Sequence, residues 1–247
     1  GAVRSQLLPF TFTRPVADIR VGILTIREKW EKYLNTTTST ITEDYLSSKW
    51  PMVEMEENIM INAAFLPTAE LVEQILELKA GEAIFHEEDV VAFHAYEEQE
   101  VKFEDCTAIE MEGKTIIIEH PWDIFKNNGA AITADYQLLT HDRKSEPLSA
   151  TNKVIAPENI FIEKGARVEC ATLNASTGPI YIAADAEIME GSTVRGPFCI
   201  GTESTLKMGT RIYGPTTVGP YCKIGGEVTN SVIFAYSNKS HDGYLGN

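Results

Sequence analysis

Few residues in this chain could do acid–base chemistry near neutral pH, and one of them stands close to its end. His241 lies between Lys239 and Tyr244. A neutral imidazole can take a proton from a reacting group near pH 7, so His241 is a candidate general base. Taken alone, such a histidine is more often a solvated surface residue than a catalytic one. The other histidines are expected to be structural, and they are His86, His94, His120 and His141.

Thiol and metal chemistry are not indicated by the residue pattern. The four cysteines show no Cys-x-x-Cys spacing, which argues against a zinc knuckle or a redox pair. Reduced, buried thiols are expected instead. Glutamates gather within residues 54–57 and 97–100, and such clusters are most simply solvated faces. The sequence therefore predicts no metal site.

The net charge of -15 argues against nucleic-acid partners, because proteins that bind phosphate backbones concentrate Lys and Arg. Residues 1–150 hold 13 basic and 27 acidic residues, a balance of -14, whereas residues 151–247 hold 8 and 9, a balance of -1. Two regions with different surfaces are expected. The chain has neither an apolar run of about 18 residues nor a signal-peptide pattern, which predicts a cytoplasmic protein without a membrane partner.

A repeat with a period of six residues must position His241. Eight branched aliphatic residues follow one another in steps of six, namely Ile182, Ile188, Val194, Ile200, Leu206, Ile212, Val218 and Ile224. A helix would repeat near 3.6 residues and an ordinary strand every two. The spacing instead predicts a triangular coil of about 18 residues, each side giving one short parallel strand. We expect residues 146–247 to form a single-stranded left-handed parallel β-helix of hexapeptide repeats.

The repeat is irregular at two places and meets the end of the sequence. Residues 172–178 interrupt the aliphatic series, which indicates a loop leaving a corner, and residues 225–230 separate Ile224 from the next aliphatic residues. The sequence stops within the repeat, without the cap that a solenoid normally needs. We therefore expect the β-helix to be truncated at its carboxyl end.

Residues 1–145 show the mixed pattern of an α/β domain. Helices are expected over residues 22–34, after the capping residue Thr68, and from Pro121 onward. Strands are expected over residues 58–65, 84–85, 90–96 and 115–118. The two middle strands should pair as a hairpin.

The opening segment resembles a known family signature. It reads Arg4-Ser-Gln-Leu-Leu-Pro-Phe-Thr-Phe-Thr-Arg-Pro-Val. This is similar to the start of sugar-phosphate nucleotidyltransferases, in which a glycine-rich loop leads to Arg, then to Leu-x-Pro-Leu-Thr, and then to Pro-Lys. The resemblance implies a divergent, incomplete Rossmann-like nucleotidyltransferase domain over residues 1–145, with Arg4 as a nucleotide-binding residue.

A second resemblance lies near the other end. Asn230-Ser-Val-Ile is followed by Ser237-Asn-Lys-Ser-His-Asp-Gly-Tyr-Leu-Gly-Asn. The order resembles the acetyltransferase signature of the bifunctional N-acetylglucosamine-1-phosphate uridyltransferase/glucosamine-1-phosphate acetyltransferase family. That signature reads Lys-Asn-Ser-x-Ile and then Ser-Lys-x-x-His-Leu-x-Tyr-x-Gly-Asp. Its members join a nucleotidyltransferase domain to a left-handed β-helix, so the resemblance covers most of the chain.

The second resemblance implies roles for individual residues. His241 would be the general base that takes a proton from the substrate amine as it attacks the acetyl-CoA thioester. Tyr244, Arg211 and Asn230 would be substrate-binding residues. Lys239 is a further candidate for binding the substrate phosphate, although a lysine on the face of a β-helix is more often simply exposed. The resemblance also implies a homotrimer whose active sites lie between adjacent β-helices.

The chain departs from both signatures. Thr229 stands where the family has the lysine before Asn-Ser, and Tyr213 replaces the second arginine of Ala-Arg-Leu-Arg-Pro-Gly. Val16 replaces the lysine of the opening signature. Asn62 begins a segment without a carboxylate where the family has its magnesium-binding Asp. Nucleotidyl transfer would therefore lack the metal that neutralises a triphosphate, and Mg²⁺ is expected only if that activity is retained.

Three functions are consistent with these patterns. The leading one is a transferase of sugar-nucleotide metabolism, in which acetyl-CoA acylates an amino-sugar phosphate or nucleotide sugar and the nucleotidyltransferase domain is degenerate. The second is a sugar-1-phosphate nucleotidyltransferase whose β-helix only assembles the oligomer. The third is a non-catalytic protein that binds sugar nucleotides.

Overall fold

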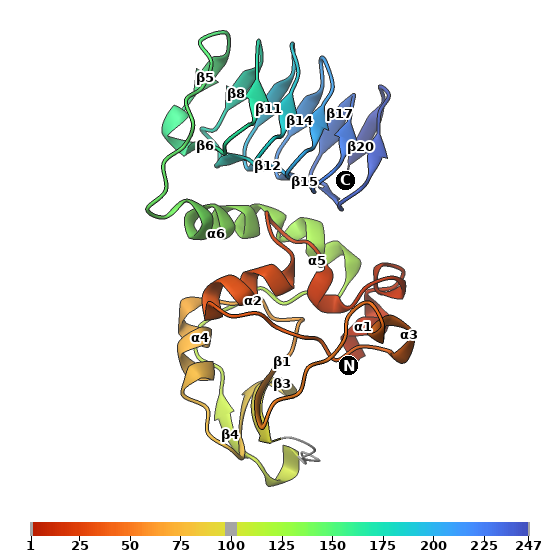
Figure 1. The fold of residues 1–247 in the computed structure, drawn as a ribbon, viewed down its shortest axis with the longest axis vertical. Helices are drawn as coiled ribbons and strands as arrows, with labels where there is room; N and C mark the ends of the chain where they lie inside the picture. The colour runs from red at the N-terminus through yellow and green to blue at the C-terminus, as the bar shows by residue number, and fades with distance from the viewer. Residues whose placement is uncertain (1, 97–102, 247) are drawn as a thin grey trace. The chain divides into compact units, whose positions relative to one another are not determined.

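The computed structural model of the chain describes residues 2–96 and 103–246 (Figure 1). By its contacts the chain divides into two compact units. One contains Gly1–Ile19 and Ile26–Pro121, and the other contains Arg20–Thr25 and Trp122–Asn247. The domain boundary that the sequence predicts between residues 145 and 146 remains a prediction. None of the helices in the described residues is long and apolar enough to cross a lipid bilayer.

The first unit contains a four-stranded mixed sheet. Its strands are β1 (Glu57–Ile61), β2 (Glu82–His86), β3 (Asp89–Tyr96) and β4 (Thr107–Glu110), in the order β1-β3-β2-β4. β3 lies antiparallel to β1 and β2, whereas β4 lies parallel to β2. The expected hairpin is therefore confirmed. The strand expected over residues 115–118 is wrong, because β4 occupies the edge of β2 and Ile117 makes only an isolated bridge with Phe65.

The helices of the first unit follow local sequence signals. In the described residues they are α1 (Ala2–Gln6), α2 (Ile26–Leu34), α3 (Asp44–Ser47) and α4 (Ala69–Leu76). The Thr68 side chain accepts a hydrogen bond from the backbone N–H of Leu71 at 3.2 Å, which confirms the predicted cap. α2 begins at Ile26 rather than at residue 22, because Gly22 has a φ of +80° and belongs to the second unit.

The second unit contains a left-handed parallel β-helix of about five turns (Figure 1). Its strands are β5 (Lys153–Ile155), β6 (Ile160–Ile162), β7 (Arg167–Val168), β8 (Thr172–Asn174), β9 (Ile180–Ile182), β10 (Glu187–Ile188), β11 (Thr193–Arg195), β12 (Phe198–Ile200), β13 (Thr205–Leu206), β14 (Arg211–Tyr213), β15 (Thr216–Val218), β16 (Lys223–Ile224), β17 (Glu227–Thr229), β18 (Val232–Ile233), β19 (Asn238–Lys239) and β20 (Tyr244–Gly246). They form three parallel sheets. We call β19-β16-β13-β10-β7 sheet 1, β20-β17-β14-β11-β8-β5 sheet 2, and β18-β15-β12-β9-β6 sheet 3.

The six-residue aliphatic series fills the interior of the β-helix. Ile188, Leu206 and Ile224 lie in register on neighbouring strands of sheet 1, which gives a coil of 18 residues. Each of these side chains is at most 1% exposed. Small residues four places after the aliphatic positions, such as Ser204 and Thr210, are fully buried at the corners. The predicted β-helix is confirmed.

The first interruption of the repeat is smaller than the sequence indicates. Residues 172–174 form β8, which pairs with β5 and β11, so the loop expected from residue 172 is wrong there. Leu173 is fully buried because it continues the apolar stack. Residues 175–179 connect β8 to β9, whereas two residues make the equivalent connection from β11 to β12. The second irregularity, residues 225–230, contains strand β17 and shortens the coil.

Apolar side chains from outside the coil cover part of sheet 3. The helix that Pro121 opens is confirmed as α5 (Pro121–Lys126), and α6 (Asn128–Thr140) follows it beside the β-helix (Figure 1). Ile132 of α6 and Ile23 form one buried cluster with outward-facing residues of sheet 3, namely Phe161, Tyr181, Ala183 and Cys199. This outer face is therefore closed to other partners over much of its length.

Hydrogen bonds hold the segment Arg20–Thr25 against α6 and sheet 3. The backbone N–H of Gly22 donates to Asn128 Oδ1 at 2.8 Å, and Thr217 Oγ1 donates to the Gly22 carbonyl at 3.0 Å. The backbone N–H of Ile23 donates to Asp135 Oδ2 at 2.8 Å. Asn128, Thr217 and Asp135 are almost fully buried, so these bonds satisfy polar groups that would otherwise be costly to bury.

Glu163 joins the residues after α6 to the β-helix. Its Oε1 accepts hydrogen bonds from Tyr181 Oη at 2.6 Å and Arg143 Nη2 at 2.7 Å, and its Oε2 accepts one from the Ala184 N–H at 3.0 Å. The Arg143 guanidinium also lies 5.1 Å from the centre of the Phe161 ring. Burial alone would raise the pKa of Glu163, but the three hydrogen bonds lower it below its ordinary value of 4.5.

We expect Glu163→Gln to lower the free energy of unfolding by about 1–3 kcal/mol at pH 7, because a charged acceptor with three donors is lost. A depressed carboxyl pKa contributes stability above its unfolded value and loses that contribution as pH falls through the folded value. The gap between wild type and variant should therefore shrink below about pH 4. Urea unfolding at pH 7 and pH 3.5 measures it. Glu158→Gln, at an exposed position, is the control, and a gap unchanged by pH contradicts the prediction.

Candidate functional site

The last coils of sheet 2 bring predicted site residues onto one outer face. Arg211 on β14 lies in register with Glu227 on β17, and Glu227 lies in register with Tyr244 on β20 (Figure 1). Residues opposite one another in a sheet point to the same face. The residues that follow Arg211 and Glu227 on their strands, Ile212 and Val228, point inward and are buried. Arg211 and Tyr244 therefore stand on the outer face on either side of Glu227.

Glu227 is a member of this group that the sequence patterns did not single out. Its Oε2 lies 3.3 Å from Arg211 Nε, and both side chains remain partly exposed. An exposed pair of this kind contributes little to stability, since solvent screens it. The contact nevertheless orients the Arg211 guanidinium on the outer face of sheet 2, which also carries Tyr244.

His241 lies at the corner formed by residues 240–243, between β19 and β20. Its side chain is exposed, three residues before Tyr244. The corner is tied to the coil by lysines, since Lys239 Nζ donates to the carbonyl of His241 at 3.1 Å and Lys207 Nζ donates to that of Ser240 at 3.3 Å. The His241 imidazole is therefore exposed on a corner that hydrogen bonds hold in place.

The two remaining solenoid candidates take different positions. Asn230 follows β17 directly and adopts a left-handed φ of 42°, which marks it as a corner residue. Lys239 lies in register with Ile224 on sheet 1, so its side chain starts from an interior position rather than from the outer face of sheet 2. The structure therefore places Arg211 and Tyr244 on one outer face, with Glu227 between them, and Lys239 beneath the His241 corner.

Arg4 is bound by side chains of its own unit. Its Nη2 donates to Tyr45 Oη at 2.6 Å, its Nε lies 3.5 Å from Glu43 Oε1, and its guanidinium lies 5.8 Å from the centre of the Tyr45 ring. A phosphate group would compete with Glu43 for the same guanidinium. The segment that should carry a magnesium ligand instead forms a turn, in which Asn62 Oδ1 accepts from the Ala64 N–H at 3.0 Å.

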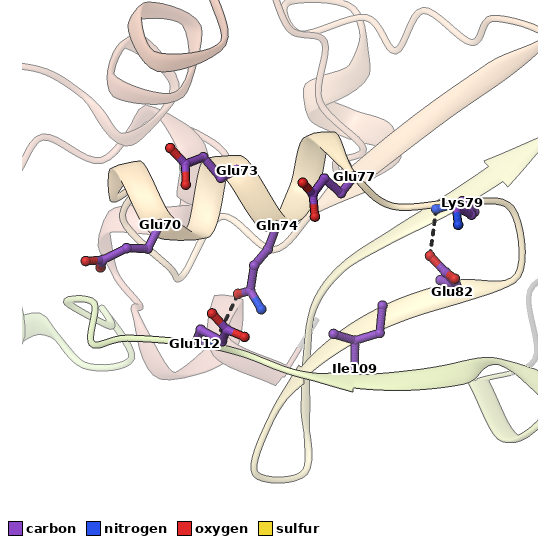
Figure 2. Close-up of a pocket in the computed structure, with 8 residues that line it drawn as sticks. All are labelled: Glu70, Glu73, Gln74, Glu77, Lys79, Glu82, Ile109 and Glu112. Carbon is purple, nitrogen blue, oxygen red and sulfur yellow. Dashed lines mark hydrogen bonds between the residues drawn. The ribbon is translucent and has the colours of Figure 1, made fainter.

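The first unit has an acidic hollow of about 430 Å³ beside α4 (Figure 2). Its lining consists of Glu70, Glu73, Gln74, Glu77, Lys79, Glu82, Ile109 and Glu112. Gln74 connects α4 to the chain after β4, since its Oε1 accepts from the Glu112 N–H at 2.9 Å. In the described residues no three His, Cys, Asp or Glu side chains are arranged to hold a metal ion. The hollow's negative charge disfavours a bare triphosphate.

The other titratable candidates have structural surroundings. His94 Nε2 lies 3.9 Å from Glu57 Oε2, and His141 Nε2 lies 3.1 Å from the exposed Asp142. The thiols of Cys199 and Cys222 are buried, but the expectation of buried thiols is wrong for Cys170, which is exposed at a corner, and only partly right for Cys106. The cluster at residues 97–100 lies outside the described residues.

Comparison with known proteins agrees with the first resemblance. A family model described as sugar nucleotidyl transferase matches residues 1–144. No curated protein matches the chain. A nucleotidyl transferase region followed by a β-helix makes this protein a transferase of sugar-nucleotide metabolism. With more than half of its length matched by that model, the chain belongs to the sugar nucleotidyl transferase family.

Proposed function

We propose that the β-helix transfers an acetyl group from acetyl-CoA to the amine of an amino-sugar phosphate or nucleotide sugar. The observation that carries the proposal is the arrangement of the last coils. His241 precedes the strand that places Tyr244 beside Glu227, and Glu227 lies beside Arg211 on the same outer face. An exposed base, an aromatic hydroxyl and a guanidinium on adjoining coils supply the groups that this reaction needs. Function is argued here from the site, since a fold alone does not assign one.

In the proposed reaction His241 acts as general base. The unprotonated amine nitrogen forms a bond to the thioester carbonyl carbon while the imidazole takes the proton that the nitrogen loses. As the carbon–sulfur bond breaks, the imidazolium returns that proton to the leaving thiolate. The products are an amide and free CoA, and His241 is neutral again. Tyr244 is positioned to contact the sugar.

Arg211 is the residue that we propose to hold the substrate phosphate. A guanidinium offers a planar fork of donors that matches phosphate oxygens, and half of this side chain is exposed. Asn230, at the corner after β17, is a further polar residue that we propose to bind the substrate. Thr229 and Tyr213 occupy positions where the related acetyltransferases have basic residues, so fewer phosphate contacts are expected here.

We also propose that the protein works as a homotrimer with active sites between neighbouring β-helices. The cover formed by α6 and the segment Arg20–Thr25 occupies much of the outer face of sheet 3. Contacts between copies would therefore use the outer faces of sheets 1 and 2. Sheet 2 carries Arg211 and Tyr244, so a neighbouring copy could add residues to the same site.

Nucleotidyl transfer by the first unit is the second candidate, favoured by the family match over residues 1–144. It would join a nucleoside triphosphate to a sugar 1-phosphate and would need Mg²⁺. The pairing of Arg4 with Glu43 and the absence of a carboxylate at Asn62 weigh against it. Binding of a sugar nucleotide without catalysis is the remaining alternative for this unit.

Direct assays separate these functions. Full-length protein is incubated with acetyl-CoA and amino sugars, amino-sugar phosphates or nucleotide amino sugars, and release of the CoA thiol is followed. Acyl transfer predicts thiol release with a phosphorylated amino sugar, and no release with any member overturns it. Calorimetry with Mg²⁺ and each nucleoside triphosphate, together with pyrophosphate release, tests the second candidate. Binding without pyrophosphate release would identify a binding module.

A further inference from the structure

Lys239 occupies a position that apolar residues hold in the preceding coils. Ile188, Leu206, Ile224 and Lys239 form one register column through sheet 1. The first three are buried, and the aliphatic part of Lys239 continues their stack at the last coil, leaving its residue only partly exposed. A lysine can bury its methylene chain along an apolar surface and carry its ammonium group to a polar edge.

The ammonium group of Lys239 donates three hydrogen bonds to backbone carbonyls. Nζ donates to the carbonyl oxygens of Gly225 at 2.6 Å, Gly243 at 3.0 Å and His241 at 3.1 Å. A lysine ammonium has three N–H donors, so no donor is left for a substrate phosphate in this arrangement. Two of the three acceptors belong to the corner that carries His241.

Lys207 and Gly225 also lie against the corner at residues 240–243. Lys207 Nζ adds a hydrogen bond to the Ser240 carbonyl at 3.3 Å. A Cβ at Gly225 would come within 2.8 Å of the Ser240 carbonyl oxygen, so a side chain there would push the corner away. The corner at residues 240–243 therefore lies against a bare stretch of backbone, and the ammonium groups of two lysines hold its carbonyl oxygens.

We propose that Lys239 is a positioning residue, which fixes the corner at residues 240–243 so that His241 is presented to the substrate amine. It does so through backbone carbonyls and does not bind the substrate phosphate. This inference rests on the proposed function of His241. It changes the role expected for Lys239 from the sequence, because three directed hydrogen bonds to backbone carbonyls replace a contact with the substrate phosphate.

Lys239→Met tests the inference, since methionine retains the apolar chain and removes the three donors. We expect kcat for acyl transfer to fall by about 10- to 100-fold with KM changed less than about 2-fold, because small misplacement of a base is costly. The loss should be equal for an amino-sugar phosphate and for the same sugar without phosphate. A rise in KM confined to the phosphorylated substrate would show a phosphate ligand and overturn the inference.

Amide hydrogen exchange supplies a readout that needs no turnover. In full-length protein, Lys239→Met should speed exchange at residues 240–243, Lys207→Met should do so less, and the exposed Lys164→Met should leave it unchanged. Unchanged exchange in Lys239→Met would contradict the positioning role. If wild type shows no acyl transfer while exchange responds as expected, then the proposed function fails and the anchoring of the corner stands.

Discussion

His241→Asn is expected to lower kcat for acyl transfer by about 10²- to 10⁴-fold, the usual contribution of a positioned general base. Asparagine retains the polarity of the side chain but cannot accept the amine proton near pH 7. Lys239 and Lys207 hold the corner by donating hydrogen bonds to its backbone carbonyls, so its geometry does not depend on the imidazole. The KM values for both substrates should therefore change less than about 3-fold.

The measurement is CoA thiol release in full-length protein at saturating substrate. His141→Asn is the matched control, because His141 is also exposed in the second unit and pairs only with the neighbouring Asp142. Its kcat should equal that of wild type. If His241→Asn retains more than about half of wild-type kcat, His241 is not the base.

The β-helix could be predicted from the sequence because each coil makes the same local demand. An inward position every six residues must be apolar, and the series from Ile182 to Ile224 meets that demand without a gap. The six-residue spacing does not reveal strand β8, because five residues connect it to β9 where the equivalent connection from β11 to β12 has two; Leu173 nevertheless faces inward. The pairing on both sides, rather than the spacing, identifies it as a strand.

The cover on sheet 3 could not be foreseen from local patterns. Gly22 forms hydrogen bonds with Asn128 and Thr217, which lie 106 and 195 positions away in the sequence. Residues 22–34 have helical periodicity, but the four residues Gly22 to Thr25 are taken up by long-range contacts. Tertiary packing overrides propensity at such places.

The residue types of the candidate site come from the sequence, whereas the register that decides which of them are neighbours comes from the structure. Steps of 18 residues would place Arg211 opposite Thr229 and Ile224 opposite Asp242. The shortened coil instead pairs Arg211 with Glu227 and Ile224 with Lys239. This shift explains why Glu227 was missed and why Lys239 lies behind the His241 corner. A sequence motif gives the residue types, whereas the pairing of the strands decides which of these residues lie on the same face of the sheet.

Gly226→Ala is expected to remove acyl transfer and to destabilise the last coil, because two costs coincide at this glycine. Gly226 has a φ of +77°, a conformation that costs a residue with a Cβ about 1–2 kcal/mol. The added Cβ would also lie 2.6 Å from the carbonyl oxygen and 2.9 Å from the nitrogen of Gly243. These backbone atoms belong to the His241 corner and cannot move aside without displacing it, so a further cost of about 1–3 kcal/mol is expected.

Gly209→Ala separates the two costs. Gly209 also has a positive φ, +70°, but a Cβ there would meet nothing within 4 Å. It should lose about 1–2 kcal/mol of unfolding free energy and retain wild-type kcat, since only the backbone conformation is penalised. Urea unfolding, amide exchange at residues 240–243 and CoA release measure both variants. Equal losses of stability and activity in the two variants would mean that backbone conformation alone matters, and that the close approach of Gly226 to Gly243 does not position His241.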